Sequence, residues 1–115
     1  MNIKKLEKTV INSLEEVKAV DIKVLDVRQL TSITDTMIIA SGTSARHIRS
    51  LAQKVIEDAK KINVYPLGTE GEDQGEWALI DLGDIVVHIM QRSIREYYQL
   101  EKLWSVDSKQ FSSSI

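Results

Sequence analysis

The apolar residues of this chain change their repeat length several times along the sequence, and the order of these changes restricts the fold. A stripe at helical spacing predicts an amphipathic helix from residue 3 to about residue 19, and residues 21–27 alternate as a strand does. The short apolar run Met37–Ala40 predicts a strand buried on both faces. A second helix is predicted directly after Ser44, because six apolar residues match the helical template without a gap: Ile48, Leu51, Ala52, Val55, Ile56 and Ala59.

Residues 77–82 and 85–90 are typical of a β-hairpin whose two-residue turn begins with Gly83. In that register Ala78, Ile80 and Leu82 pair with Ile89, Val87 and Ile85, so one face of the hairpin is wholly apolar and belongs to the core. The opposite face pairs Trp77, Leu79 and Asp81 with Met90, His88 and Val86. Two interpretations of this face stay open: either the last helix covers it, or it is an exposed binding surface with an aromatic anchor and a polar rim.

The remaining segments complete the predicted order of elements. The only proline, Pro66, is expected to open a loop that contains Gly68, Gly71 and Gly75. Ser93 and Glu96 have the spacing of a capping box, with Ser93 as N-cap, which predicts a last helix through residue 104. The order is αββαββα, so we expect an α/β fold with a mixed sheet of about four strands. Residues 1–104 are predicted to be a single domain and residues 105–115 a flexible tail.

Composition excludes several classes of function. The net charge of −2 argues against a nucleic-acid binder that acts through bulk charge. The absence of cysteine excludes disulfides, thiolate zinc sites and cysteine nucleophiles. No apolar run reaches the roughly 20 residues that a membrane span needs, and the N-terminus does not read as a signal peptide. These observations predict a small, soluble, cytoplasmic protein.

The charges are unevenly distributed along the chain. Between residues 62 and 91 there is no Lys or Arg, and the whole chain has 15 basic and 17 acidic residues. This segment contains six carboxylates: Glu70, Glu72, Asp73, Glu76, Asp81 and Asp84. The rest of the chain therefore has 15 basic against 11 acidic residues. The acidic segment is either a solvated loop or a surface that docks onto a basic partner, since complementary charge steers encounter and orientation.

The sequence offers weak signals for catalysis. The turn Ser41–Ser44, between a strand and a helix, could hold a phosphate on backbone N–H groups, which leaves a nucleotide-binding or nucleotidyl-transferring enzyme as the alternative function. The turn lacks the P-loop lysine, and no Asp-x-Asp strand follows it to hold metal ions. His47 is expected at the surface and His88 as a hydrogen-bonded sheet residue. We therefore predict no catalytic residues, no metal site and no cofactor.

Short motifs in a fixed order resemble the ribosomal silencing factor family, also called Iojap-like, over residues 1 to about 105, and the match is of the close, bacterial kind. The motifs are Ser32-Ile-Thr-Asp35, Met37-Ile-Ile-Ala-Ser-Gly-Thr-Ser44, Arg46-His47, Pro66-Leu-Gly68, Glu70-Gly71, Glu76-Trp77, Asp81-Leu-Gly-Asp84, Val87-His88, Arg95 and Tyr98-x-Leu-Glu-x-Leu-Trp104. The resemblance implies a nucleotidyltransferase-like fold without the catalytic carboxylates.

The resemblance also implies a function. Family members are non-enzymatic translational repressors that bind ribosomal protein L fourteen on the large ribosomal subunit. They thereby block association with the small subunit, lower translation in nutrient limitation or stationary phase, and are often homodimers when free. We expect the protein to bind neither a membrane nor a specific nucleic acid sequence. The implied partner-binding residues are Trp77, Leu79, Asp81 and His88 of the hairpin, followed by Arg95, Tyr98 and Glu101 of the last helix. Trp77 is the expected anchor and Asp81 the expected partner of a basic group, whereas Arg46 and His47 match the family pattern without an assigned role.

Overall fold

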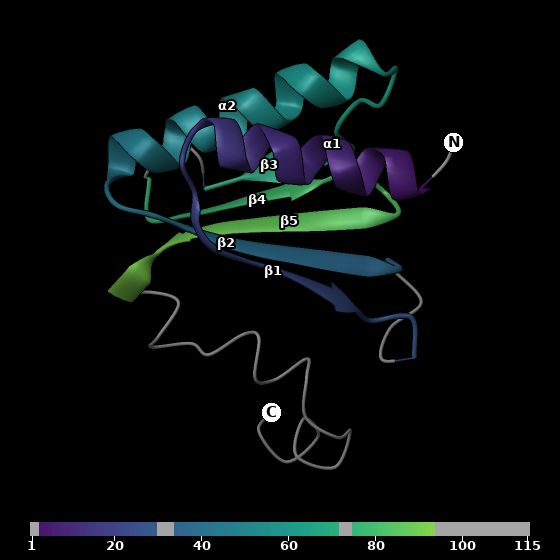
Figure 1. Cartoon of the computed structure of the whole chain (residues 1–115), viewed down its shortest axis with the longest axis horizontal. Helices are drawn as coiled ribbons and strands as arrows, with labels where there is room; N and C mark the ends of the chain where they lie inside the picture. Colours follow the sequence, from purple (N-terminus) through teal and green to yellow (C-terminus); the bar gives the residue numbers. More distant parts are fainter. Residues whose placement is uncertain (1–2, 30–33, 72–74, 94–115) are drawn as a thin grey trace.

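The computed structural model describes residues 3–29, 34–71 and 75–93 of the chain, which form two helices and five strands. The elements in chain order are α1 (Ile3–Glu16), β1 (Val20–Asp26), β2 (Thr36–Gly42), α2 (Ala45–Lys61), β3 (Gly68–Glu70), β4 (Trp77–Asp81) and β5 (Ile85–Gln91). Both helices lie on the same face of the sheet (Figure 1). The molecule thus has one helical layer on one sheet layer, an α/β arrangement as predicted.

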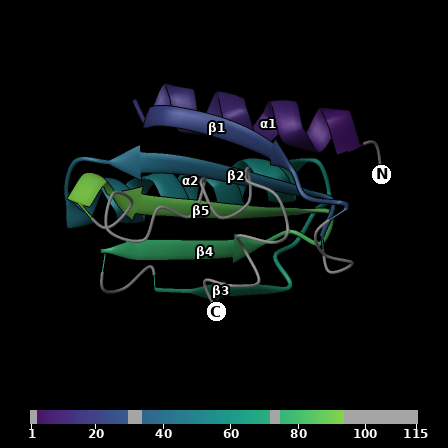
Figure 2. The same ribbon diagram turned by 90° about the horizontal axis from the view of Figure 1, so that it is seen from below.

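The strands follow the order β1-β2-β5-β4-β3 across a single mixed sheet. The two central strands, β2 and β5, are parallel, and every other neighbouring pair is antiparallel. Figure 2 shows the strands in this order with the helices behind them. A parallel pair needs a crossover connection, which contains α2 and places that helix against the middle of the sheet.

The main core lies between the helices and the sheet. The α2 stripe predicted from the sequence faces the sheet, with Ile48, Leu51, Val55 and Ala59 fully buried. Ile56, the outermost member of that stripe, is only partly buried. The hairpin face predicted to be apolar supplies the strand side of this core through Ala78, Ile80, Leu82, Ile85, Val87 and Ile89.

The hairpin has the predicted register and turn. Ala78 is opposite Ile89, and Ile80 is opposite Val87. The Leu82 N–H donates to the Ile85 carbonyl at 2.8 Å, and Gly83 has a φ of +89°. A positive φ at the first central residue is the conformation that a two-residue hairpin turn requires, and it favours glycine.

The loop expected to open at Pro66 instead contains a fifth strand, β3, at the edge of the sheet. Thr69 is opposite Ile80 and Glu70 is opposite Leu79 of β4. The sequence Gly-Thr-Glu has little intrinsic strand preference, so pairing with β4 determines its conformation. The predicted last helix and the tail lie outside the described residues, although helical backbone already begins at Arg92, which makes Ser93 a helical residue and not the N-cap.

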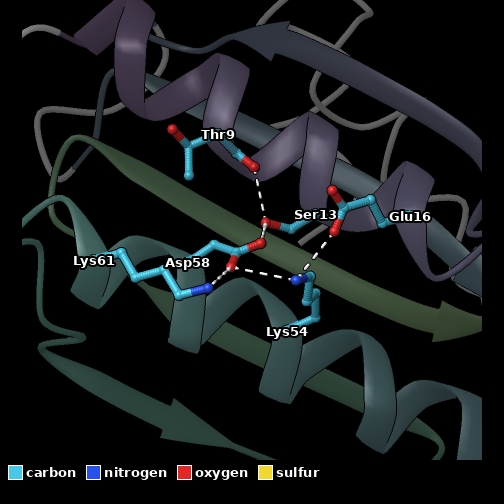
Figure 3. Close-up of polar contacts among 6 residues, drawn as sticks. All are labelled: Thr9, Ser13, Glu16, Lys54, Asp58 and Lys61. Atoms are coloured by element: carbon cyan, nitrogen blue, oxygen red, sulfur yellow. Dashed lines mark hydrogen bonds and ion pairs between the residues drawn. The ribbon is translucent and has the colours of Figure 1, made fainter.

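A polar cluster joins the two helices (Figure 3). The Ser13 hydroxyl lies 2.6 Å from the Asp58 carboxylate and 2.8 Å from the Thr9 carbonyl, and its single proton is shared between these two acceptors. Lys54 contacts both Asp58, at 3.5 Å, and Glu16, at 3.0 Å. Burial alone would raise the pKa of Asp58, but the Ser13 hydroxyl and the Lys54 ammonium hold it below its ordinary value. The cluster therefore contains an ionised carboxylate that is stabilised from both helices.

Candidate partner-binding face of the sheet

The sheet face that points away from both helices contains the hairpin residues singled out in the sequence. Trp77 is opposite Met90, Leu79 is opposite His88 and Asp81 is opposite Val86. A second apolar cluster occupies the middle of this face, formed by Val27, Met37, Ile39 and Met90, and Trp77 packs against it. Trp77, Leu79 and Asp81 are half-buried. These three β4 side chains combine an indole, an aliphatic group and a carboxylate on one short strand.

A hydrogen bond joins Trp77 to His88 across neighbouring strands. The Trp77 indole N–H donates to Nδ1 of His88 at 2.9 Å, and the ring centroids are 5.8 Å apart with planes tilted by 52°. His88 is only 7% exposed, and burial lowers the pKa of its imidazole to about 4. Because Nδ1 accepts a hydrogen bond, the neutral ring carries its proton on Nε2. His88 is thus the hydrogen-bonded sheet residue that was predicted.

Asp81 has a local role that the sequence analysis missed. Its Oδ1 accepts a hydrogen bond from the Gly83 N–H at 2.9 Å, and its backbone carbonyl accepts one from the Leu67 N–H at 2.7 Å. The first contact is an Asx turn, in which an aspartate binds the backbone two residues further along the chain. The spacing in Asp81-Leu-Gly83 is the signal that could have revealed it. One carboxylate oxygen of Asp81 therefore stabilises the hairpin turn.

Strand β3 brings an acidic side chain to this face. Directly paired residues of antiparallel strands share a face, and Glu70 is opposite Leu79. The exposed Glu70 side chain therefore lies on the same side of the sheet as Leu79 and Asp81. The sequence predicts a loop around Glu70, and a residue in a loop cannot be assigned to either face of the sheet. Lys23 lies on this face too, at the β1 edge, because it is opposite Ile39.

Glycines hold the acidic segment close to the start of β4. Gly71 has a φ of +78°, and a Cβ built there would lie 1.9 Å from the Trp77 carbonyl oxygen. A Cβ built at Gly75 would lie 2.5 Å from the Cβ of Ala45, and the Gly75 carbonyl accepts a hydrogen bond from the Gln91 side chain at 2.8 Å. The close approach of backbone at Gly71 leaves no room for a side chain. Glu76 and Asp84 are exposed, whereas Glu72 and Asp73 lie outside the described residues.

The Thr43 N–H and the Ser44 hydroxyl of the Ser41–Ser44 turn are both bound to His47. The Thr43 N–H donates to Nδ1 of His47 at 2.9 Å, and the Ser44 hydroxyl caps α2 by accepting from the His47 N–H. The His47 Nε2–H donates to the Val17 carbonyl at 2.5 Å. The half-buried ring therefore joins the segment before α2 to the segment after α1, and His47 is not the surface residue that the sequence predicts. Gly42 packs closely on α2, since a Cβ there would lie 2.7 Å from the Cδ1 methyl of Ile48. The turn borders a hollow of about 320 Å³ that Arg92 also lines.

Other predicted site residues fall outside this geometry. Arg46 is exposed at the start of α2. Arg95, Tyr98 and Glu101 lie outside the described residues, as does the last helix, which was one candidate to cover the face.

Within residues 3–29, 34–71 and 75–93, no three His, Asp or Glu side chains are grouped so that they could hold a metal ion. Neither helix in these ranges is long and apolar enough to cross a membrane.

Comparison with known proteins identifies the family. Residues 1–114 match the family described as "Ribosomal silencing factor during starvation". The chain is 41% identical over 112 residues to the ribosomal silencing factor RsfS of Chromobacterium violaceum, covering 97% of this chain and 92% of that protein. It is 47% identical over 93 residues to the protein of the same name from Haemophilus influenzae, covering 81% of this chain and 91% of that one.

The fold agrees with this assignment. A crystal structure of a Chromobacterium violaceum protein superimposes with a TM-score of 0.90 at 42% sequence identity, covering 94% of this chain and 90% of that one. The protein that carries this face thus belongs to a class of regulatory proteins. The chain is a member of the ribosomal silencing factor family.

Proposed function

We propose that this protein represses translation by binding ribosomal protein L fourteen on the large ribosomal subunit, where it sterically blocks association of the small subunit. It acts in the cytoplasm, under nutrient limitation or in stationary phase. The observation that carries the proposal is the group formed by Trp77, Leu79, Asp81 and Glu70, on the sheet face opposite the helices. We call these four residues the docking patch.

The composition of the docking patch suits a basic protein partner. A half-buried indole can be desolvated fully on binding, and tryptophans at the centre of interfaces often contribute most of the affinity. Asp81 and Glu70 attract the basic side chains that are common in ribosomal proteins. The same carboxylates repel RNA phosphates, so they favour a protein surface over bare ribosomal RNA. Charge and apolar contact thus select the same kind of partner.

Two further parts of the proposal rest on the family resemblance. Arg95, Tyr98 and Glu101 contribute secondary contacts to the partner, and the free protein forms a homodimer. Occlusion needs only a stable complex at the subunit interface, so a protein without catalytic groups can perform it. In this mechanism the paired strands β3, β4 and β5 support the backbone of the docking patch.

Co-sedimentation with purified large subunits tests the proposal. Trp77→Ala should weaken binding by about 2 kcal/mol or more, roughly thirtyfold, if Trp77 is the anchor. Asp81→Asn should weaken binding less; it removes the charge but keeps an oxygen that can accept from the Gly83 N–H. Tyr65→Ala and Glu57→Gln are matched controls, because both side chains are exposed on the helical side of the molecule and should bind as the wild type does.

Each outcome has a clear meaning once circular dichroism shows that the variants are folded. Loss of binding in Trp77→Ala and Asp81→Asn alone supports the docking patch. Equal binding of all variants would place the interface elsewhere. Binding of the wild type to preassembled ribosomes as tightly as to isolated large subunits would contradict occlusion. Cross-linking to ribosomal protein L fourteen, or to a different neighbour, identifies the partner directly.

A further inference from the structure

Trp77 and His88 lie diagonally across strands β4 and β5, and the contact between them constrains the indole. Trp77 is opposite Met90, two residues beyond His88, so the indole must lean along the sheet to reach Nδ1 of His88. The hydrogen bond is 2.9 Å long, and the two rings are tilted and not stacked. A hydrogen bond to the end of the indole restrains how the tryptophan side chain can rotate. The contact therefore favours one orientation of the indole on the sheet.

His88 itself has little surface with which to meet a partner. It lies on β5 between β2 and β4, paired with Ile39 on one side and Leu79 on the other. Only 7% of His88 is exposed, whereas Trp77 on the neighbouring strand β4 is half-buried. The backbone of His88 is thus held by strands on both sides, and Nδ1 of its ring is occupied by the Trp77 indole N–H.

We propose that His88 is a positioning residue for docking: it holds the Trp77 indole in its binding orientation and does not itself contact the partner. This inference rests on the proposed function, because it assigns a role within the docking patch. An anchor that is already ordered loses less conformational freedom on binding, so preorganisation increases affinity without adding a contact. Without the His88 acceptor, binding must also order the indole, and the entropic cost of ordering one side chain corresponds to about two- to tenfold weaker docking.

A pair of substitutions at position 88 separates positioning from packing. His88→Leu removes the acceptor and keeps an apolar side chain, whereas His88→Asn keeps a hydrogen-bond acceptor at about the distance of Nδ1 from the backbone. In the free protein, the indole N–H resonance of Trp77 should be protected from exchange in the wild type and in His88→Asn, and exchange faster in His88→Leu. Comparison with Trp77→Phe assigns this resonance, because Trp104 is the other tryptophan of the chain.

Binding to large subunits completes the test. His88→Leu should bind about two- to tenfold more weakly through faster dissociation, and His88→Asn should recover most of the affinity. In a Trp77→Phe background, which has no indole N–H, His88→Leu should cause no further loss. An equal loss in both backgrounds, or wild-type affinity and protection in His88→Leu, would overturn the inference. Failure of the wild type to bind would instead refute the proposed function, and the protection pattern would still report whether His88 orders the indole.

Discussion

Acidification should destabilise this protein through His88. Burial lowers the pKa of the folded imidazole to about 4, and the indole N–H on Nδ1 also requires the neutral ring. An unfolded histidine has a pKa of about 6.5. Between these two values the unfolded chain binds a proton at this residue and the folded chain does not. The stability contributed by a neutral His88 is therefore complete above pH 6.5 and is lost as the pH falls towards 4.

The magnitude follows from the shift of the pKa. Each pH unit within this window costs about 1.4 kcal/mol, so the free energy of unfolding should fall by about 2 kcal/mol between pH 6.5 and pH 5. Urea unfolding of the wild type and of His88→Leu at several pH values measures this loss. The leucine variant should lack this part of the pH dependence. Equal losses in the two proteins, or an NMR titration midpoint of His88 near 6.5 in the folded state, would refute the reasoning.

Other substitutions test separate parts of the fold. Asp58→Asn should lower the free energy of unfolding by about 1–2 kcal/mol at pH 7, and this difference should vanish as the pH falls through the lowered pKa of Asp58, as urea unfolding can show. Gly71→Ala should destabilise by about 3 kcal/mol, because its Cβ would meet the Trp77 carbonyl; Gly68→Ala, with open space around it, is the thermal-unfolding control. His47→Ala should cost about 2 kcal/mol in urea unfolding, because it removes the ring that bridges Thr43 and Val17, whereas Arg46→Ala should change stability by less than about 0.5 kcal/mol.

The parts of the fold that depend on local patterns could be predicted from the sequence. The α2 stripe and the two hairpin strands each bury one face, so their apolar spacing shows which side chains enter the core. The turn at Gly83 then fixed the register, and with it the shared face of Trp77, Leu79 and His88. Strand β3 could not be predicted in this way, because its three residues become a strand only by pairing with β4.

The candidate site shows the same division. The sequence alone determined that Trp77, Leu79 and Asp81 share a hairpin face beside an acidic segment, because alternation along a strand is a local property. The tertiary structure decided that Glu70 joins this face and that the Trp77 indole donates a hydrogen bond to His88. It also decided that the Thr43 N–H binds His47. These are contacts between segments distant in the sequence or between side chain and backbone, and only the assembled sheet fixes the distances and burial that they require.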